Sequence, residues 1–336
     1  MNNTRKRLVL SIIFLMSTCL ISCNGNNEDE KSIVFTIGLI GDEILKVGDE
    51  GCELSEALVY YATMKNDYEQ DFGEGFFDSQ EETSKLKEKL SEIAVSRVVQ
   101  IKIMNIIARD MGIELSAEEV LKVEQLSEEF FEGLAEDEIL ALKVELGTVT
   151  TMYTEYALAN KLYDETIADI DYEISDDAAR SVTVNRMIFD SEFVDYEVVL
   201  SAFESIGLGE DFIRVAAETE NTTLTQSSFA MDDEDIDKAV KEAAFDLAVG
   251  ECSSVIITET GYEIIECVDS INRDETEVNK QNMIEKMQND KFNDIYVEYA
   301  KDLIEYRDDD LWRRSVDNLD DCVKTREFFR LYNEKF

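Results

Sequence analysis

The sequence predicts an α+β protein with a helical N-terminal domain, a small α+β domain after it, and a long helix near the C-terminus. Changes in the spacing of apolar residues carry this prediction. Apolar residues recur at helical spacing over most of residues 55–168 and alternate with period two over residues 182–189. Helical spacing returns over residues 276–306, and a short tail follows. The length of 336 residues allows two domains, and 44% hydrophobic residues supply their cores.

The first residues predict export. Positive residues at positions 5–7 precede an apolar run over residues 8–20, as in a signal peptide. The run is too short to span a bilayer comfortably. It ends in "LISC", residues 20–23, which is similar to the lipobox of bacterial lipoproteins.

The lipobox implies a signal peptide over residues 1–22 and a lipid anchor on Cys23, with residues 23–40 as a polar tether. The protein is therefore expected at the cell membrane, lipid-anchored on its extracytoplasmic face. An ordinary secretory signal with an incidental cysteine is the alternative.

The charge of the chain limits its partners. Asp and Glu number 76 against 32 Lys and Arg, which gives a formal net charge of -44. Such a surface repels nucleic acid and keeps the protein soluble. The chain contains no histidine and no C-x-x-C motif, so a zinc site would need scattered thiolates to converge. We expect no metal site and no cofactor.

Residues 41–170 are predicted to form the helical domain. Its signals include a long helical run that Gly112 ends, and a capping box, Ser116 to Glu119, that opens the next helix. A further helix follows Gly147. The aromatic and methionine stripes of these helices are typical of a core, and no catalytic constellation is present.

Residues 175–272 are predicted to form the small α+β domain. A strand over 182–189 leads into two helices, a polar loop, a helix at 241–247 and a closing hairpin. If that hairpin turns at "TETG", Cys252 and Cys267 are cross-strand neighbours, either as two thiols or as a disulfide.

Several segments carry a resemblance to a known family. "LGEDFIRVAAETE" and "EAAFDLAVGECSSVIITETGYEII" resemble the second half of a parvulin-type peptidyl-prolyl isomerase domain. "MGIELSAEEV" and "EYALANKLYDE" resemble the chaperone module of SurA- and PrsA-like exported foldases. The resemblance implies a chaperone module over 41–170, a parvulin-like domain over 175–272, and a C-terminal segment, 276–336, that returns to the helical module.

The resemblance also implies that the isomerase site is degenerate. Arg186 and Glu263 stand where the family carries histidines on its first and last strands, and Phe245 is the retained residue expected to bind substrate. A lone buried charge costs several kcal/mol, so the two replacements make physical sense as a pair. We therefore predict a guanidinium–carboxylate contact within about 4 Å.

The leading functional hypothesis is a membrane-tethered chaperone that binds unfolded exported polypeptides and has lost isomerase activity. An active isomerase with a rearranged pocket is a second hypothesis, because parvulin chemistry has no obligatory proton transfer. A ligand-binding or adhesive surface lipoprotein is a third.

Overall fold

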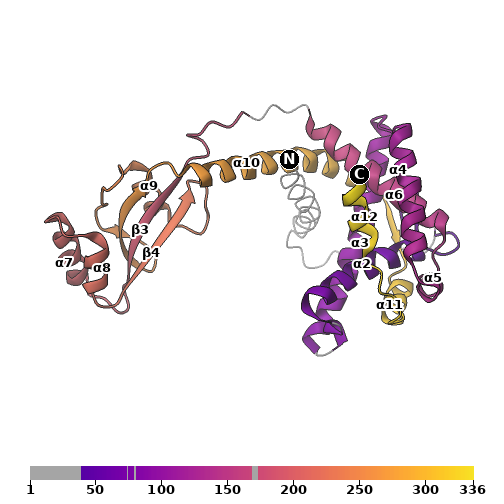
Figure 1. Ribbon diagram of the computed structural model, residues 1–336, viewed down its shortest axis with the longest axis horizontal. Coiled ribbons are helices and arrows are strands. Elements are labelled where there is room, and N and C mark those ends of the chain that lie inside the picture. Colours follow the sequence, from indigo (N-terminus) through magenta and orange to yellow (C-terminus); the bar gives the residue numbers. More distant parts are fainter. Residues whose placement is uncertain (1–38, 74, 79–80, 169–172) are drawn as a thin grey trace. The chain divides into compact units, whose positions relative to one another are not determined.

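The structure confirms the α+β class. It is a computed structural model that describes residues 39–73, 75–78, 81–168 and 173–336 (Figure 1). The described residues form two compact units, one within 1–170 and 289–336 and the other within 171–288. The predicted signal peptide and Cys23 lie outside the described residues. In the part of the chain that is described, no helix combines the length and apolar character needed to cross a membrane.

The first unit is built mainly from helices. The predicted capping box is present: Ser116 Oγ accepts a hydrogen bond from the Glu119 N–H at 3.3 Å, and the Glu119 carboxylate accepts one from the Ser116 N–H at 2.6 Å. Together these bonds satisfy two backbone donors at the start of a helix. The helices are α2 (Leu54–Phe72), α3 (Glu81–Asp110), α4 (Ala117–Gly133), α5 (Glu136–Leu142) and α6 (Leu146–Ala168), and the 3-10 turn η1 (Phe76–Asp78) precedes α3.

The last residues of the chain complete the first unit, although the sequence predicted only a tail there. β7 (Glu305–Arg307) pairs with β1 (Glu43–Val47), which pairs with β2 (Glu50–Glu53), in an antiparallel sheet of order β2-β1-β7. Two amphipathic helices follow, α11 (Asp309–Asp317) and α12 (Glu327–Lys335). The tail is therefore part of the fold.

Phe328 of α12 lies at the centre of an aromatic cluster in the first core. Its buried ring stacks on Tyr153, with centroids 4.2 Å apart, and the Tyr153 hydroxyl donates to the Phe328 carbonyl at 3.0 Å. Tyr60, Phe130 and Tyr156 meet the same ring edge-on. One side chain from the C-terminus thus joins α2, α4 and α6.

The second unit is a four-stranded antiparallel sheet of order β4-β3-β6-β5. Side chains alternate between its two faces. Met187, Phe189 and Ile264 pack with α7 and α8 on one face, whereas Val184 and Ile265 pack with α9 on the other. The elements are β3 (Ser181–Asp190), α7 (Tyr196–Gly207), α8 (Phe212–Glu218), β4 (Thr222–Ala230), α9 (Lys238–Asp246), β5 (Ile256–Ile257) and β6 (Gly261–Asp269).

The prediction of a polar loop before α9 was wrong, because β4 occupies most of that segment. Its sequence, TTLTQSSFA, contains three threonines, which favour strands despite their polarity. All nine residues of β4 pair with β3 in unbroken register. β4 is therefore defined by its pairing with β3 more than by its own sequence.

The resemblance implied that the C-terminal segment, 276–336, returns to the helical module and does not pack on the parvulin-like domain, and this was wrong for the first part of its long helix. The helix is α10 (Arg273–Ala300), and its N-terminal part belongs to the second unit. Thr276 Oγ1 accepts from the first backbone N–H of β3 at 3.1 Å, and Asn279 donates to the carbonyl of Ala179 at 3.0 Å. The apolar stripe did not reveal these polar contacts with the sheet. The C-terminal part of α10 lies in the first unit, where Phe292 is buried.

The predicted pairing of Cys252 with Cys267 was wrong by one residue. Cys252 bridges Glu266 instead, and both thiols are free. The Ser253 N–H donates to the Ile265 carbonyl at 2.8 Å, and Ser253 Oγ accepts from the Ile265 N–H at 3.0 Å. This hydroxyl replaces a backbone acceptor. The pairing with β6 therefore shifts by one residue between the bridge at Cys252 and the strand β5. The two cysteines consequently belong to opposite faces of the sheet.

Truncating the central ring of the first core should unfold that unit. We expect Phe328→Ala to lower its free energy of unfolding by about 3–5 kcal/mol, because the cavity left among aromatic rings cannot collapse. Urea denaturation followed by the fluorescence of Trp312 measures this, since Trp312 is the one tryptophan of the chain and is buried in this unit. Phe336→Ala is the matched control, because Phe336 stacks on Tyr332 at the surface. A loss no larger than that of the control would contradict the role of Phe328.

Candidate functional site

The centre of the second unit brings Arg186 and Glu263 together. Arg186 lies on β3 and Glu263 on β6, and Ile188 is directly opposite Glu263 in the register. Arg186 is therefore a diagonal neighbour of Glu263 on the same face, which long side chains can bridge. Gly261 sets this register, because a Cβ there would lie 1.9 Å from the carbonyl oxygen of Phe189.

The predicted guanidinium–carboxylate contact is confirmed, and it is bidentate. Arg186 Nε donates to Glu263 Oε2 at 2.9 Å, and an Arg186 terminal nitrogen donates to Oε1 at 2.8 Å. The side chains are only 13% and 6% exposed. Parallel charge-assisted bonds of this kind are strong and fix the relative orientation of both groups.

This pair has little capacity for proton transfer. An arginine keeps its proton in proteins, and both carboxylate oxygens of Glu263 already accept bonds from Arg186. On the same face, Arg186 has Ile265 of β6 opposite it on one side and Thr225 of β4 on the other. Glu263 has Ile256 of β5 opposite it. The arrangement ties two strands together and leaves no exposed acid or base at the centre of the face.

Phe245, the residue expected to bind substrate, contacts a different arginine. The guanidinium carbon of Arg180 lies 4.5 Å from the centroid of the Phe245 ring, and Arg180 donates to the Phe245 carbonyl at 2.8 Å. Arg180 precedes β3, so these contacts lie at the opposite end of that strand from Asp190. Among the described residues, no ring contact or hydrogen bond joins Phe245 to the Arg186–Glu263 pair.

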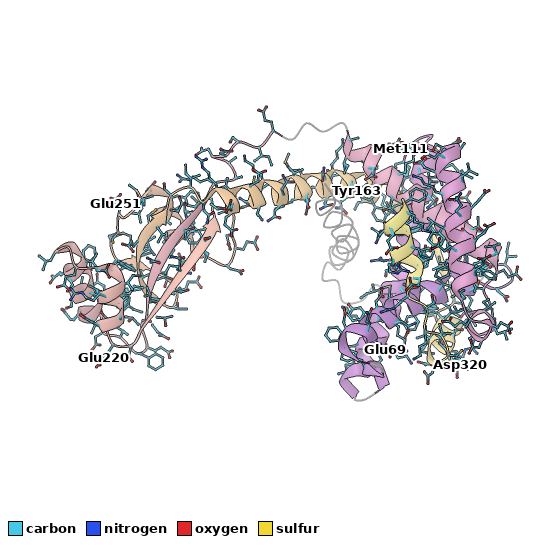
Figure 2. The ribbon with its side chains drawn as sticks, viewed as in Figure 1. Glu69, Met111, Tyr163, Glu220, Glu251 and Asp320 are labelled. Atoms are coloured by element: carbon cyan, nitrogen blue, oxygen red, sulfur yellow. The ribbon has the colours of Figure 1, made fainter. Side chains whose placement is uncertain are left out.

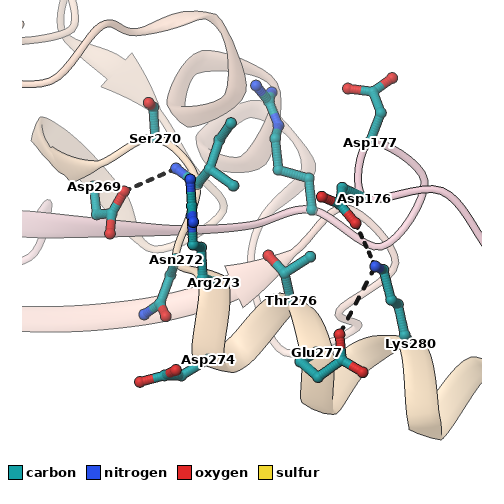
Figure 3. Close-up of a pocket in the computed structure, with 12 residues that line it drawn as sticks. Asp176, Asp177, Asp269, Ser270, Asn272, Arg273, Asp274, Thr276, Glu277 and Lys280 are labelled. Carbon is teal, nitrogen blue, oxygen red and sulfur yellow. Dashed lines mark hydrogen bonds and ion pairs between the residues drawn. The ribbon is translucent and has the colours of Figure 1, made fainter.

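A polar cavity of about 940 Å³ lies near the start of α10 (Figure 3). Lys280 forms ion pairs there with Asp176 and Glu277, and the Asp269 carboxylate accepts from the Ile271 N–H at 2.9 Å. These side chains satisfy one another. Within the described part of the chain, no group of three or more Cys, Asp and Glu side chains is placed to hold a metal ion.

An exposed aromatic groove lies between the end of α2 and the start of α3. It encloses about 250 Å³, and its walls are almost entirely apolar. Phe72 is 63% exposed and Tyr68 is 46% exposed, with their rings stacked at 6.1 Å. A contiguous apolar patch of this kind on a soluble surface is typical of an interaction site. The aromatic groove is lined by Tyr68, Phe72, Phe76, Phe77, Leu86, Lys89, Leu90 and Ile93.

A buried charge cluster joins three helices of the first unit. Lys102 of α3 is 1% exposed, and its Nζ lies 2.7 Å from a Glu155 carboxylate oxygen and 3.0 Å from one of Glu56. Burial, together with the charge of Glu56, raises the pKa of Glu155 to about 8 against the opposing effect of Lys102. Burial likewise raises the pKa of Glu56. Two carboxyl groups around one ammonium group therefore hold a proton near neutral pH.

The sequence did not indicate the aromatic groove or the buried cluster. Glu56, Lys102 and Glu155 lie on three helices far apart in the chain, and each looks like an ordinary surface charge. The groove forms where the end of α2, the turn η1 and the start of α3 come together. Its only sequence signal was the density of aromatic residues at 68–77.

The chain matches no protein-family model and no curated protein. Among solved structures, it is similar to the peptidylprolyl isomerase PrsA of Bacillus cereus, with 19% identity over 75% of this chain and 92% of that one, and a TM-score of 0.32.

Two further similar structures are the foldase protein PrsA of Lactococcus lactis and a SurA-like chaperone of Campylobacter jejuni. The first has 18% identity over 83% of this chain and 99% of that one, with a TM-score of 0.30. The second has 11% identity over 80% and 100%, also with a TM-score of 0.30.

Breaking the Arg186–Glu263 pair should destabilise the second unit in a coupled way. Arg186→Met or Glu263→Gln alone leaves one buried partner unpaired, at a cost of about 3–5 kcal/mol for a full charge. We expect the double variant to recover at least about 1 kcal/mol of the summed losses. Hydrogen exchange at the backbone amides of Ile264 and Ile265 measures the local stability.

The exposed pair Arg214–Glu210 on and before α8 serves as the control for this cycle. Its coupling energy should be within about 0.5 kcal/mol of zero, because solvent screens it. Equal coupling in the two cycles would show that the Arg186–Glu263 contact does not stabilise the sheet.

The buried cluster predicts a pH dependence of the first unit. The folded-state pKa of Glu155 is raised above its unfolded value, so its contribution to stability is complete at low pH and is lost as pH rises to about 8. The free energy of unfolding should fall between pH 5 and 8 by up to about 1.4 kcal/mol per pH unit. Glu155→Gln should flatten this slope, whereas Glu124→Gln, at an exposed position, should not. Trp312 fluorescence in urea gives both profiles, and equal slopes would contradict the assignment.

Proposed function

We propose that this protein is a membrane-anchored extracytoplasmic chaperone of the SurA and PrsA type. It binds unfolded exported polypeptides through the first unit and does not catalyse prolyl isomerisation. Attachment through Cys23 follows from the lipobox at residues 20–23 and is part of the proposal.

The aromatic groove is the observation that carries the proposal. Phe72 and Tyr68 expose large apolar surfaces beside a cavity with apolar walls. Unfolded chains expose apolar side chains that folded chains bury, so a groove of this composition favours them without requiring a defined sequence. The net charge of -44 keeps a complex with such a chain soluble.

The Arg186–Glu263 pair supports the absence of isomerase activity. Prolyl isomerisation has a barrier of about 18–20 kcal/mol, and a catalytic pocket lowers it by holding the twisted amide in an apolar site. A charged pair at the centre of the α9 face works against such a pocket. The parvulin-like unit is therefore proposed to serve as a binding and spacing domain.

Suppression of aggregation tests this function. The mature chain, without residues 1–22, should slow the aggregation of a chemically denatured client protein, as measured by light scattering. Phe72→Ser should weaken that effect by about threefold or more, because it removes the most exposed ring of the groove.

Phe193→Ser is the matched control. Phe193 is 68% exposed, comparable with Phe72, but it lies in the second unit and is not part of the aromatic groove. The control variant should protect the client as well as the unaltered chain does. The proposal fails if the unaltered chain gives no protection, or if the two variants lose it equally.

A further inference from the structure

β4 forms an open edge of the sheet in the second unit. In the order β4-β3-β6-β5 it has β3 on one side and no strand of the described chain on the other (Figure 1). It is nine residues long, whereas β5, at the other edge, has two. Long edge strands present unpaired backbone groups that can pair with another chain.

The hydrogen bonds of Ser181 and Ile265 identify the outward backbone groups of β4, which are those that point away from β3 at the open edge of the sheet. The Ser181 N–H and C=O both bond away from β4, to Thr276 and Asn272. Along an antiparallel strand these directions alternate, so the next residue of β3, and every second one after it, bonds toward β4.

The outward groups of β4 therefore belong to Leu224, Gln226 and Ser228 in the middle of the strand. In the register, these residues face β3 residues that bond toward β6. The bonds of Ile265 agree with this alternation. Its N–H and C=O bond to Ser253 and not to its β3 partner Arg186, so Arg186 bonds toward β4. All three β4 residues are exposed, and Leu224 is 38% exposed.

None of the usual protections against strand addition is present in β4. Proteins commonly protect edge strands with charged residues, proline or a bulge. The sequence TTLTQSSFA has no charge and no proline, although 32% of the chain is charged, and its pairing with β3 is continuous. The edge is continuous and neutral, and its middle is exposed.

We propose that the β4 edge binds an extended polypeptide segment as a fifth strand of the sheet. Leu224, Gln226 and Ser228 would each contribute a backbone donor and acceptor to the added strand. This inference rests on the proposed function, because it describes how an unfolded client would be held at a second place. The bonds are made by backbone, so they suit clients of unrelated sequence.

The charges at the ends of β4 identify the kind of segment that fits. Glu220 lies in the turn before the strand (Figure 2), and the exposed Asp232 follows it. A bound segment with a neutral, β-branched centre and a basic residue at each end would complement both. A second copy fits poorly, because an antiparallel β4–β4 pair would bring Glu220 of one chain toward Asp232 of the other.

Amide hydrogen exchange resolved by NMR tests the inference on the mature chain. The probe is the synthetic peptide KKTVTVTKK, and a peptide of the same composition with N-methylated valines is its control. We expect exchange at Leu224, Gln226 and Ser228 to slow by about tenfold or more with the first peptide only. Protection of these amides that grows with protein concentration, in the absence of peptide, would instead indicate a second copy and overturn the proposal.

Two variants separate backbone from side-chain effects. Gln226→Pro removes an outward N–H and leaves the bonds to β3 in place, so peptide affinity should fall by about tenfold. Gln226→Ala removes only the side chain, including its bond to Asn185 at 3.1 Å, and should bind normally. If Gln226→Pro does not fold, the N-methylated peptide still decides the question. Unchanged exchange at all three amides, in a chain that suppresses aggregation, would overturn strand addition and leave the proposed function standing.

Discussion

Arg186 and Glu263 depend on each other because both side chains are largely buried on the two central strands of the second unit. Either charge alone would lie unpaired beneath α9, at a cost of several kcal/mol, whereas the bidentate pair satisfies both groups. The pair also determines what the sheet can do. It joins β3 to β6 at the centre of the face and, among the described residues, leaves that centre without an accessible acid or base. Functions of this unit then depend on its periphery.

The surfaces that remain open differ in chemistry. The aromatic groove of the first unit offers apolar area, and the β4 edge of the second offers backbone hydrogen bonds. An unfolded polypeptide presents both kinds of group, and neither surface requires a particular sequence. The acidic exterior adds a preference for neutral or basic segments. These features agree in favouring the holding of unfolded chains over catalysis on a single peptide bond.

The sequence predicted those features that depend on local pattern or on a physical necessity. The α+β class followed from apolar periodicity. The Arg186–Glu263 contact followed from the family resemblance, which implied that the two positions face each other, together with the cost of burying one charge alone. The β4 strand was missed because its polar residues resemble a loop until β3 supplies the pairing. The slip at Cys252 depends on one hydroxyl of Ser253 that replaces a backbone acceptor. Such long-range contacts leave little trace in local sequence.

The rate of cis-to-trans isomerisation of a proline-containing tetrapeptide tests the central claim most directly. The mature chain is added at increasing concentrations, with a histidine-bearing parvulin as the positive control. If the Arg186–Glu263 pair is structural, the rate stays at its uncatalysed value at every concentration, because no pocket lowers the barrier of about 18–20 kcal/mol. A rate that rises in proportion to the concentration of the chain, and that Glu263→Gln abolishes while the sheet remains folded, would contradict the account.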